Sequence, residues 1–122
     1  QKNLVFVLHS NHPNEIDDHV VNAVIALRDA GAILLNQSVL LRDINNSPEV
    51  LVKLSRRLFD AGVLPYYLHL LDPVAGAQHF DVPEVEGANL IGQMSRQLPG
   101  YLVPRLSREL PGAEAKQVIA AQ

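Results

Sequence analysis

Strand-like apolar runs alternate with helix-like segments along this chain, and that alternation most constrains its fold. The expected strands are Leu4–Ser10, Ala32–Leu41, Val63–Leu71 and Tyr101–Ser107. Nearly continuous apolar strands that alternate with helices are typical of a parallel sheet with helices on its faces. The sequence therefore predicts an α/β fold in which successive strands are joined by right-handed connections.

The intervening segments carry helix start and stop signals. Asn14 is expected to cap a first helix, which Gly31 closes. Ser47 is expected to cap a second helix, which ends in Asp60–Gly62. A third helix is expected over 84–98, although its two glycines weaken the pattern. The tail after the fourth strand is interpreted as a loop followed by a short apolar segment.

Four parallel strands fit two architectures. They can form a small, doubly wound flavodoxin-like sheet, or an arc of a larger, partial TIM-type (β/α) barrel with its helices on the outer face. In both architectures ligands bind beyond the carboxyl ends of the strands. Pro104 indicates a strand edge or a strand end, because proline cannot donate to a sheet ladder.

Length, charge and cysteine usage limit the possible functions. The 122 residues suit one domain, and a net charge of −3 argues against nucleic acid or an acidic membrane as partner. We expect a cytoplasmic protein, because neither a signal peptide nor a transmembrane run is evident. With no cysteine, the chain itself can supply no disulfide and no cysteine ligand to an iron–sulfur cluster. A first residue that is Gln1 suggests a piece of a longer protein, or the loss of a few N-terminal residues.

Polar side chains gather at the exits of all four expected strands. They are His9, Ser10, Asn11, His12, His69, Asp72, Arg105 and Ser107, together with Asn36 and Gln37 inside the second strand. Asn36 and Gln37 interrupt an apolar run, and an unpaired buried amide group would cost about 1–3 kcal/mol. Either other protein groups satisfy these two amides, or the strand opens onto a ligand cavity.

Each polar residue also has a structural interpretation. His9 and His12 can cap a helix or face water, and as an H-x-x-H pair they lack a third ligand, so no metal site is expected. Asp72 precedes a proline and can form an Asx-turn. Lys116 can be a solvated surface lysine, because its surroundings do not match a phosphate-binding P-loop.

Five motifs, in order, resemble the C-terminal part of the lysine 2,3-aminomutases. They are "NHPNEI", "LLNQSVLLRDIN", "PYYLHLLD", "GAQHF" and "PGYLVP", which together extend over essentially the whole chain. The family combines S-adenosylmethionine, a 4Fe-4S cluster and pyridoxal phosphate in radical chemistry. "YYLHLLD", "GAQHF" and "LSREL" are most similar to the branch that makes (R)-β-lysine from (S)-lysine for modification of elongation factor P.

The resemblance implies a cofactor pocket. Lys116 matches the lysine that binds pyridoxal phosphate covalently, and residues 108–122 would form the tail that carries it, after barrel units in 1–107. His9, Gln37, Asn36 and His69 would line the pocket for S-adenosylmethionine and pyridoxal phosphate.

The resemblance also implies two acidic residues that bind the substrate. Asp72 would hold the side-chain ammonium of lysine, and Glu109 stands where the free-lysine mutases carry an aspartate. The glycine run that usually precedes the cofactor lysine is reduced to Gly112, which should stiffen this loop.

The implied partners lie partly outside this chain. The cluster ligands would come from the N-terminal remainder of the same protein, so the fragment alone should be inactive. The other partners would be lysine as a small-molecule substrate, the elongation factor P pathway and, because an open barrel arc exposes a strand edge, further copies in a homo-oligomer. The competing interpretation is a small, non-catalytic, flavodoxin-like binding or regulatory domain, which would be a stable monomer.

Overall fold

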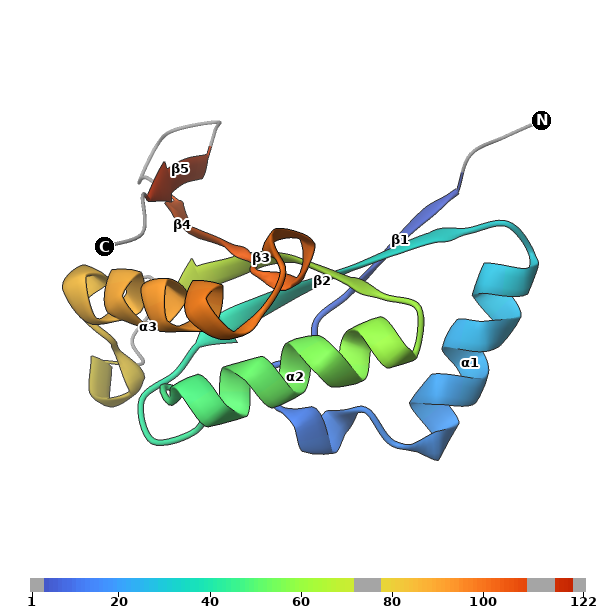
Figure 1. Ribbon diagram of the computed structural model, residues 1–122, viewed down its shortest axis with the longest axis horizontal. Helices are drawn as coiled ribbons and strands as arrows, with labels where there is room; N and C mark the ends of the chain where they lie inside the picture. The colour runs from blue at the N-terminus through green and yellow to red at the C-terminus, as the bar shows by residue number, and fades with distance from the viewer. Residues whose placement is uncertain (1–3, 72–77, 110–115, 120–122) are drawn as a thin grey trace.

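The computed structural model describes residues 4–71, 78–109 and 116–119, and Figure 1 shows them as one sheet packed against helices. The strands are β1 (Val5–Leu8), β2 (Ile33–Leu40), β3 (Leu64–Leu70), β4 (Arg105–Glu109) and β5 (Lys116–Ile119). The α-helices are α1 (Asp18–Asp29), α2 (Pro48–Asp60) and α3 (Glu84–Gln97). Among the described residues, no helix is both long and apolar enough to cross a membrane.

The strands lie side by side in the order in which they occur in the chain. Strands β1 to β4 are parallel neighbours, and β5 pairs antiparallel with β4. This confirms the expected α/β class with a mostly parallel sheet. The flavodoxin-like order, in which the first strand lies inside the sheet, is not what the described strands adopt. The tail prediction missed β5, which is antiparallel because residues 110–115 are too few for a parallel crossover.

Helix α2 begins where the sequence predicted. The side-chain oxygen of Ser47 accepts a hydrogen bond from the backbone N–H of Val50, and Pro48 occupies the first turn. The expected Asn14 cap is wrong, because Pro13–Glu15 form a separate 3-10 turn and α1 starts after its own cap, Asp17.

Two further boundaries can be compared with the sequence. Residues 84–97 form α3, as expected. An added Cβ at Gly87 would lie 3.2 Å from side-chain carbons of Leu70 and Leu106, so this glycine lets the helix approach the sheet closely. The fourth strand starts at Arg105 rather than Tyr101, because residues 100–102 form a 3-10 turn.

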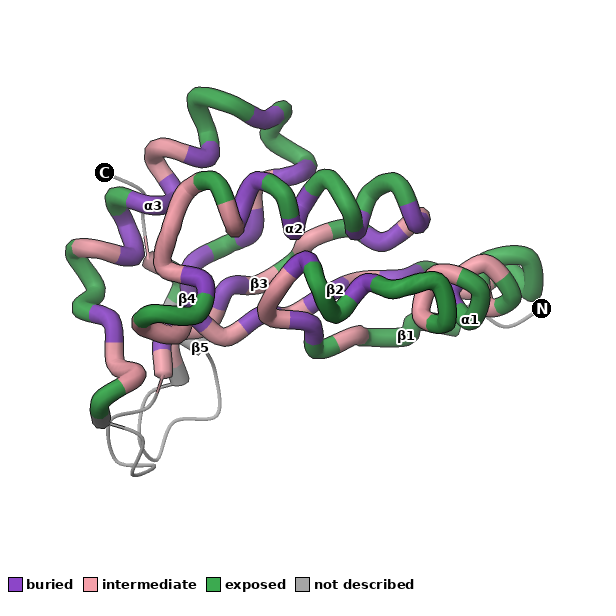
Figure 2. Tube along the Cα trace, turned by 90° about the horizontal axis from the view of Figure 1, so that it is seen from below, coloured by how far each residue is buried: buried purple, intermediate pink, exposed green. Residues whose placement is uncertain are grey.

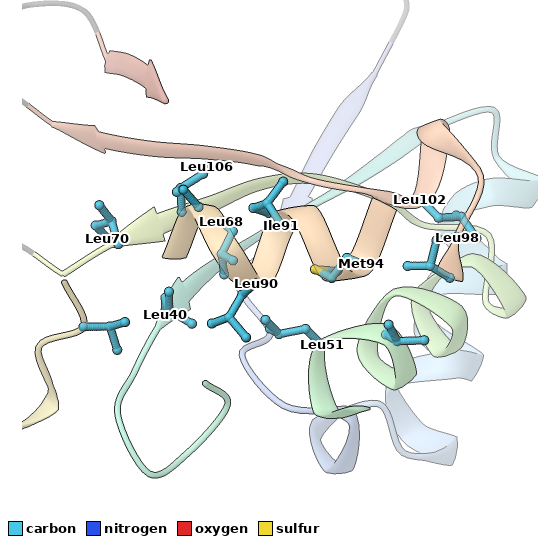
Figure 3. Close-up of a cluster of buried hydrophobic side chains, with 13 residues drawn as sticks. Leu40, Leu51, Leu68, Leu70, Leu90, Ile91, Met94, Leu98, Leu102 and Leu106 are labelled. Carbon is cyan, nitrogen blue, oxygen red and sulfur yellow. The ribbon is translucent and has the colours of Figure 1, made fainter. Parts of the chain in front are cut away.

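Alternate residues of β2, β3 and β4 pack against the helices. Leu40, Leu68 and Leu106 are at most 1% exposed and lie in the larger core cluster with residues of α2 and α3, as Figure 3 shows. A second cluster joins Leu34 of β2 to apolar residues of α1 and α2. Figure 2 shows buried positions recurring along α2, α3 and the central strands, with more exposed positions in α1 and β1.

The other alternate residues of the sheet form what we call the open face, which carries no helix in the described part of the chain. Its members are Val5, Val7, Ile33, Leu35, Gln37, Val39, Leu64, Tyr67, His69, Arg105, Ser107 and Val118, as the strand registers show. Val5, Ile33 and Val118 are each more than half exposed. Apolar side chains at this exposure, on one face of a sheet, are typical of a surface that contacts something else.

The cap of α2 gives a prediction about pH. The pKa of Glu49 is lowered from its usual value of 4.5, first by a hydrogen bond from its own backbone N–H and then by one from the Ser47 hydroxyl, at 2.8 Å. The folded state therefore favours the charged form of the Glu49 carboxyl group. The stability that this carboxylate contributes is present above pH 4.5 and is lost as pH falls through the lower pKa of Glu49 in the folded state.

Replacing Ser47 with alanine should therefore raise the pKa of Glu49 towards 4.5, which NMR titration of its carboxyl carbon can follow. The same change should reduce the free energy of unfolding by about 0.5–2 kcal/mol, because the helix loses its cap. Glu49→Gln, which keeps the cap, is the control. An unchanged Glu49 titration in Ser47→Ala would contradict the assigned bond.

Candidate functional site

Three side chains from three adjacent strands form a hydrogen-bonded row across the open face. Nε2 of His69 lies 2.9 Å from Oε1 of Gln37, and Nδ1 of His69 lies 2.6 Å from Oγ of Ser107. Parallel pairing of β2, β3 and β4 places these three positions side by side. Ser107 is fully buried, whereas Gln37 and His69 are partly exposed. The row therefore has an anchored end on β4 and a more accessible end on β2.

Two tyrosines extend this polar region along β3. A register shift next to Asn36 and Gln37 leaves Tyr66 without a partner in β2, and the Tyr66 and Tyr67 ring centroids come within 4.2 Å. Bulges of this kind re-aim side chains. The ring of Tyr67 stacks on that of His69 at 5.4 Å.

The tyrosine pair is also linked electrostatically. A hydrogen bond with the Tyr67 side chain raises the pKa of Tyr66 above 10.0, with the Tyr67 charge acting in the same direction, while the positive charge of Arg105 opposes the shift. Two phenols and a guanidinium therefore lie close enough to influence one another.

Asn36 belongs to the opposite, helix-covered face. Its side chain is 1% exposed and exchanges two hydrogen bonds with the backbone of Ser10, accepting from N at 2.9 Å and donating to O at 3.1 Å. It also donates to Oγ of Ser38 at 2.9 Å. Other protein groups thus satisfy this amide, so the geometry does not support a cofactor contact by Asn36 and separates it from Gln37.

The Asn45 side chain also binds backbone groups through its amide, and the sequence analysis did not identify it. It is fully buried, accepts a hydrogen bond from the N–H of Leu41, and donates to the carbonyls of Asn11 and Val39. Asn11 in turn accepts from the N–H of Val39. These amides join the loop after β1 to the end of β2. A run of polar residues in "RDINN" gave no sign that one of them would be buried.

The other predicted site residues either lie apart from the row or fall, wholly or in their side chains, outside the described part of the chain. His9 is exposed just after β1 and shares no hydrogen bond with the row in the described part. The backbones of Glu109 and Lys116 are directly paired between β4 and β5, while their side chains lie outside the description. Asp72 falls outside the described residues altogether.

A pocket of about 230 Å³ lies at the exits of β3 and β4. It is lined by Leu70, Leu71, Asp81, Val82, Pro83, Glu84 and Arg108. Arg108 forms an ion pair with Glu84 at 2.6 Å, which leaves Asp81 as the other charged side chain of the lining. Among the described residues, no group of three or more His, Asp or Glu side chains is arranged to hold a metal ion.

Comparison with known proteins gives a consistent set of relatives. The chain is 47% identical, over 98% of its length, to the L-lysine 2,3-aminomutase of Escherichia coli, and 46% identical over 95% to that of Haemophilus influenzae. It is 39% identical over 88% to the L-lysine 2,3-aminomutase of Clostridium subterminale. The chain spans about a third of the first two relatives and 26% of the third. No family model matches the chain.

Proposed function

We propose, from the premise that this chain belongs to the lysine 2,3-aminomutase family, that it is the C-terminal part of an enzyme that converts (S)-lysine to (R)-β-lysine. The observation that carries this proposal is 47% identity to an L-lysine 2,3-aminomutase along 98% of the chain. We further propose that the product serves the modification of elongation factor P and that the enzyme acts in the cytoplasm. By itself the chain would be inactive, because it contains no cysteine for a cluster.

The strand order supports an arc of a (β/α) barrel. Right-handed connections between strands in sequential order put every helix on one side of the sheet, as in a barrel wall. The open face would then be the barrel interior, and its exposed apolar residues would be covered by the remainder of the protein. Strand β1, at the edge of the described sheet, would adjoin another strand of the barrel. Without the remainder of the protein, the exposed strand edge and open face would favour a homo-oligomer.

The open face is chemically suited to the proposed cofactors. Both pyridoxal phosphate and S-adenosylmethionine carry anionic oxygens, and Gln37, Tyr66, Tyr67 and Arg105 offer donors for them in or beside this face. When bound, these cofactors and a 4Fe-4S cluster would supply radical formation and the electron sink for migration of an amino group. The chain's own residues would bind and orient them, with His69 on the central strand β3 and Gln37 beside it on β2.

The strand register supports Lys116 as the residue that binds pyridoxal phosphate covalently. Positions 116 and 118 are two residues apart in β5, so they belong to the same face of the sheet. Val118 pairs with Ser107, which belongs to the open face. A lysine amine is a suitable nucleophile for a carbonyl cofactor. Asp72 is proposed to bind the side-chain ammonium of the substrate lysine, Glu109 to be a second acidic residue that binds the substrate, and His9 to line the S-adenosylmethionine pocket.

Reductive labelling tests the site in this chain. Pyridoxal phosphate followed by borohydride should label Lys116 ahead of Lys2 and Lys53, as read by peptide mass spectrometry. Lys53 is a matched internal control, because it is exposed on α2, on the helix-covered side of the sheet. Equal labelling of all three lysines would contradict a preformed cofactor site in the chain.

A further inference from the structure

The His69 ring has both of its nitrogens within hydrogen-bond distance of a neighbouring side chain. Gln37 lies at 2.9 Å on one side and Ser107 at 2.6 Å on the other. Tyr67 stacks on the same ring with an interplanar angle of 26°. The ring therefore has little freedom to rotate, and its hydrogen bonds fix where its protons lie.

Only one proton arrangement of the neutral ring satisfies both contacts. The carbonyl oxygen of Gln37 can only accept, so Nε2 of His69 carries the proton and donates it. Nδ1 is then the acceptor, and the hydroxyl of Ser107 donates to it. Because Ser107 is fully buried, water cannot readily replace it in this role.

This arrangement determines what Gln37 can offer to a ligand. With its oxygen held by His69, the Gln37 amide directs its NH₂ group away from the row, and this nitrogen donates no hydrogen bond within the described part of the chain. Gln37 is also only partly buried, so the donor is accessible from the open face.

We propose that Ser107 and His69 are positioning residues, which lock the Gln37 side chain so that its NH₂ group donates to a carbonyl or carboxylate oxygen of a ligand on the open face. The choice of ligand rests on the proposed function, but the locked row does not. Ser107 acts through His69, and His69 acts through Gln37. A glutamine amide that is free to flip can offer either its NH₂ group or its oxygen to a ligand. The locked Gln37 amide offers only its NH₂ group, so it would favour ligands that carry an acceptor oxygen.

NMR of the chain labelled with ¹⁵N in its histidine rings and glutamine side chains tests this lock without any cofactor. In the unaltered chain we expect a His69 Nε2–H signal with slow solvent exchange, and one sharp pair of Gln37 NH₂ signals. In Ser107→Ala the ring proton should exchange at least about tenfold faster and the Gln37 signals should broaden, because the donor to Nδ1 is gone. Ser107→Thr, which keeps Oγ, should restore both signals.

Two results would overturn the proposal. One is a His69 ring protonated at Nδ1 in the unaltered chain, and the other is unchanged ring exchange in a folded Ser107→Ala. Should Ser107→Ala fail to fold, Gln37→Leu removes the acceptor at a partly exposed position and should speed exchange of the Nε2 proton equally. Unchanged exchange in that variant would also refute the lock. This NMR test uses no cofactor. Failure of pyridoxal phosphate to label Lys116 would therefore count against the proposed function, but not against the lock.

Discussion

Replacing Lys116 with arginine should abolish β-lysine formation in a chimera whose matching third comes from this chain and whose remainder comes from the Escherichia coli relative. Arginine keeps the positive charge, but its guanidinium stays protonated and cannot act as the amine nucleophile that the cofactor requires. Loss of a covalent catalytic residue of this kind lowers turnover on the order of a thousandfold or more.

The measurement is mass spectrometry of β-lysine formed from isotopically labelled lysine. Lys53→Arg in the same chimera is the matched control, because this exposed lysine lies on α2, on the helix-covered side of the sheet. It should leave turnover within a factor of about two, since exposed surface substitutions of this kind are usually tolerated. Equal turnover in the Lys116→Arg and Lys53→Arg chimeras would remove Lys116 from the proposed site.

Asn36→Leu should reduce the free energy of unfolding by about 3 kcal/mol, one of the largest losses expected from a single polar residue here. Leucine is of similar size but leaves the buried N–H of Ser10 without an acceptor and deprives the Ser38 hydroxyl of a donor. The pairing between the loop after β1 and strand β2 should weaken as a result. Urea denaturation monitored by circular dichroism gives the free energy.

Asn22→Leu is the control for this change, because Asn22 is exposed on α1. Its effect should lie within about 0.5 kcal/mol. If Asn36→Leu were as stable as Asn22→Leu, the bonds to Ser10 would contribute little, and an apolar residue would serve equally well at position 36.

Hydrophobic pattern and capping residues were enough to predict the α/β class, the parallel strands and the start of α2. The start of α2 is a local feature, because the Ser47 side chain accepts from the N–H of Val50 and Pro48 occupies the first turn. Helix α1 was misplaced because Pro13–Glu15 form their own turn, capped by a nitrogen of His12. Strand β5 was missed because its four residues form a strand only by pairing with β4.

The candidate site was only partly predictable, because it also depends on how the strands pair. Asn36 and Gln37 are neighbours with similar chemistry, and both were expected to share one environment. Successive strand residues point to opposite faces, so one amide joins the loop after β1 and the other joins His69. The role of Ser107 depends on register across β2, β3 and β4, which no local pattern specifies.

The most direct test of the central claim is β-lysine formation by the chimera that carries the unaltered chain, measured beside the parent Escherichia coli protein. We predict turnover within about tenfold of the parent, because the open face would supply the same ligand contacts to the same cofactors. A chimera that folds and binds both cofactors, yet forms no β-lysine while the parent does, would contradict the assignment of this chain to a lysine 2,3-aminomutase.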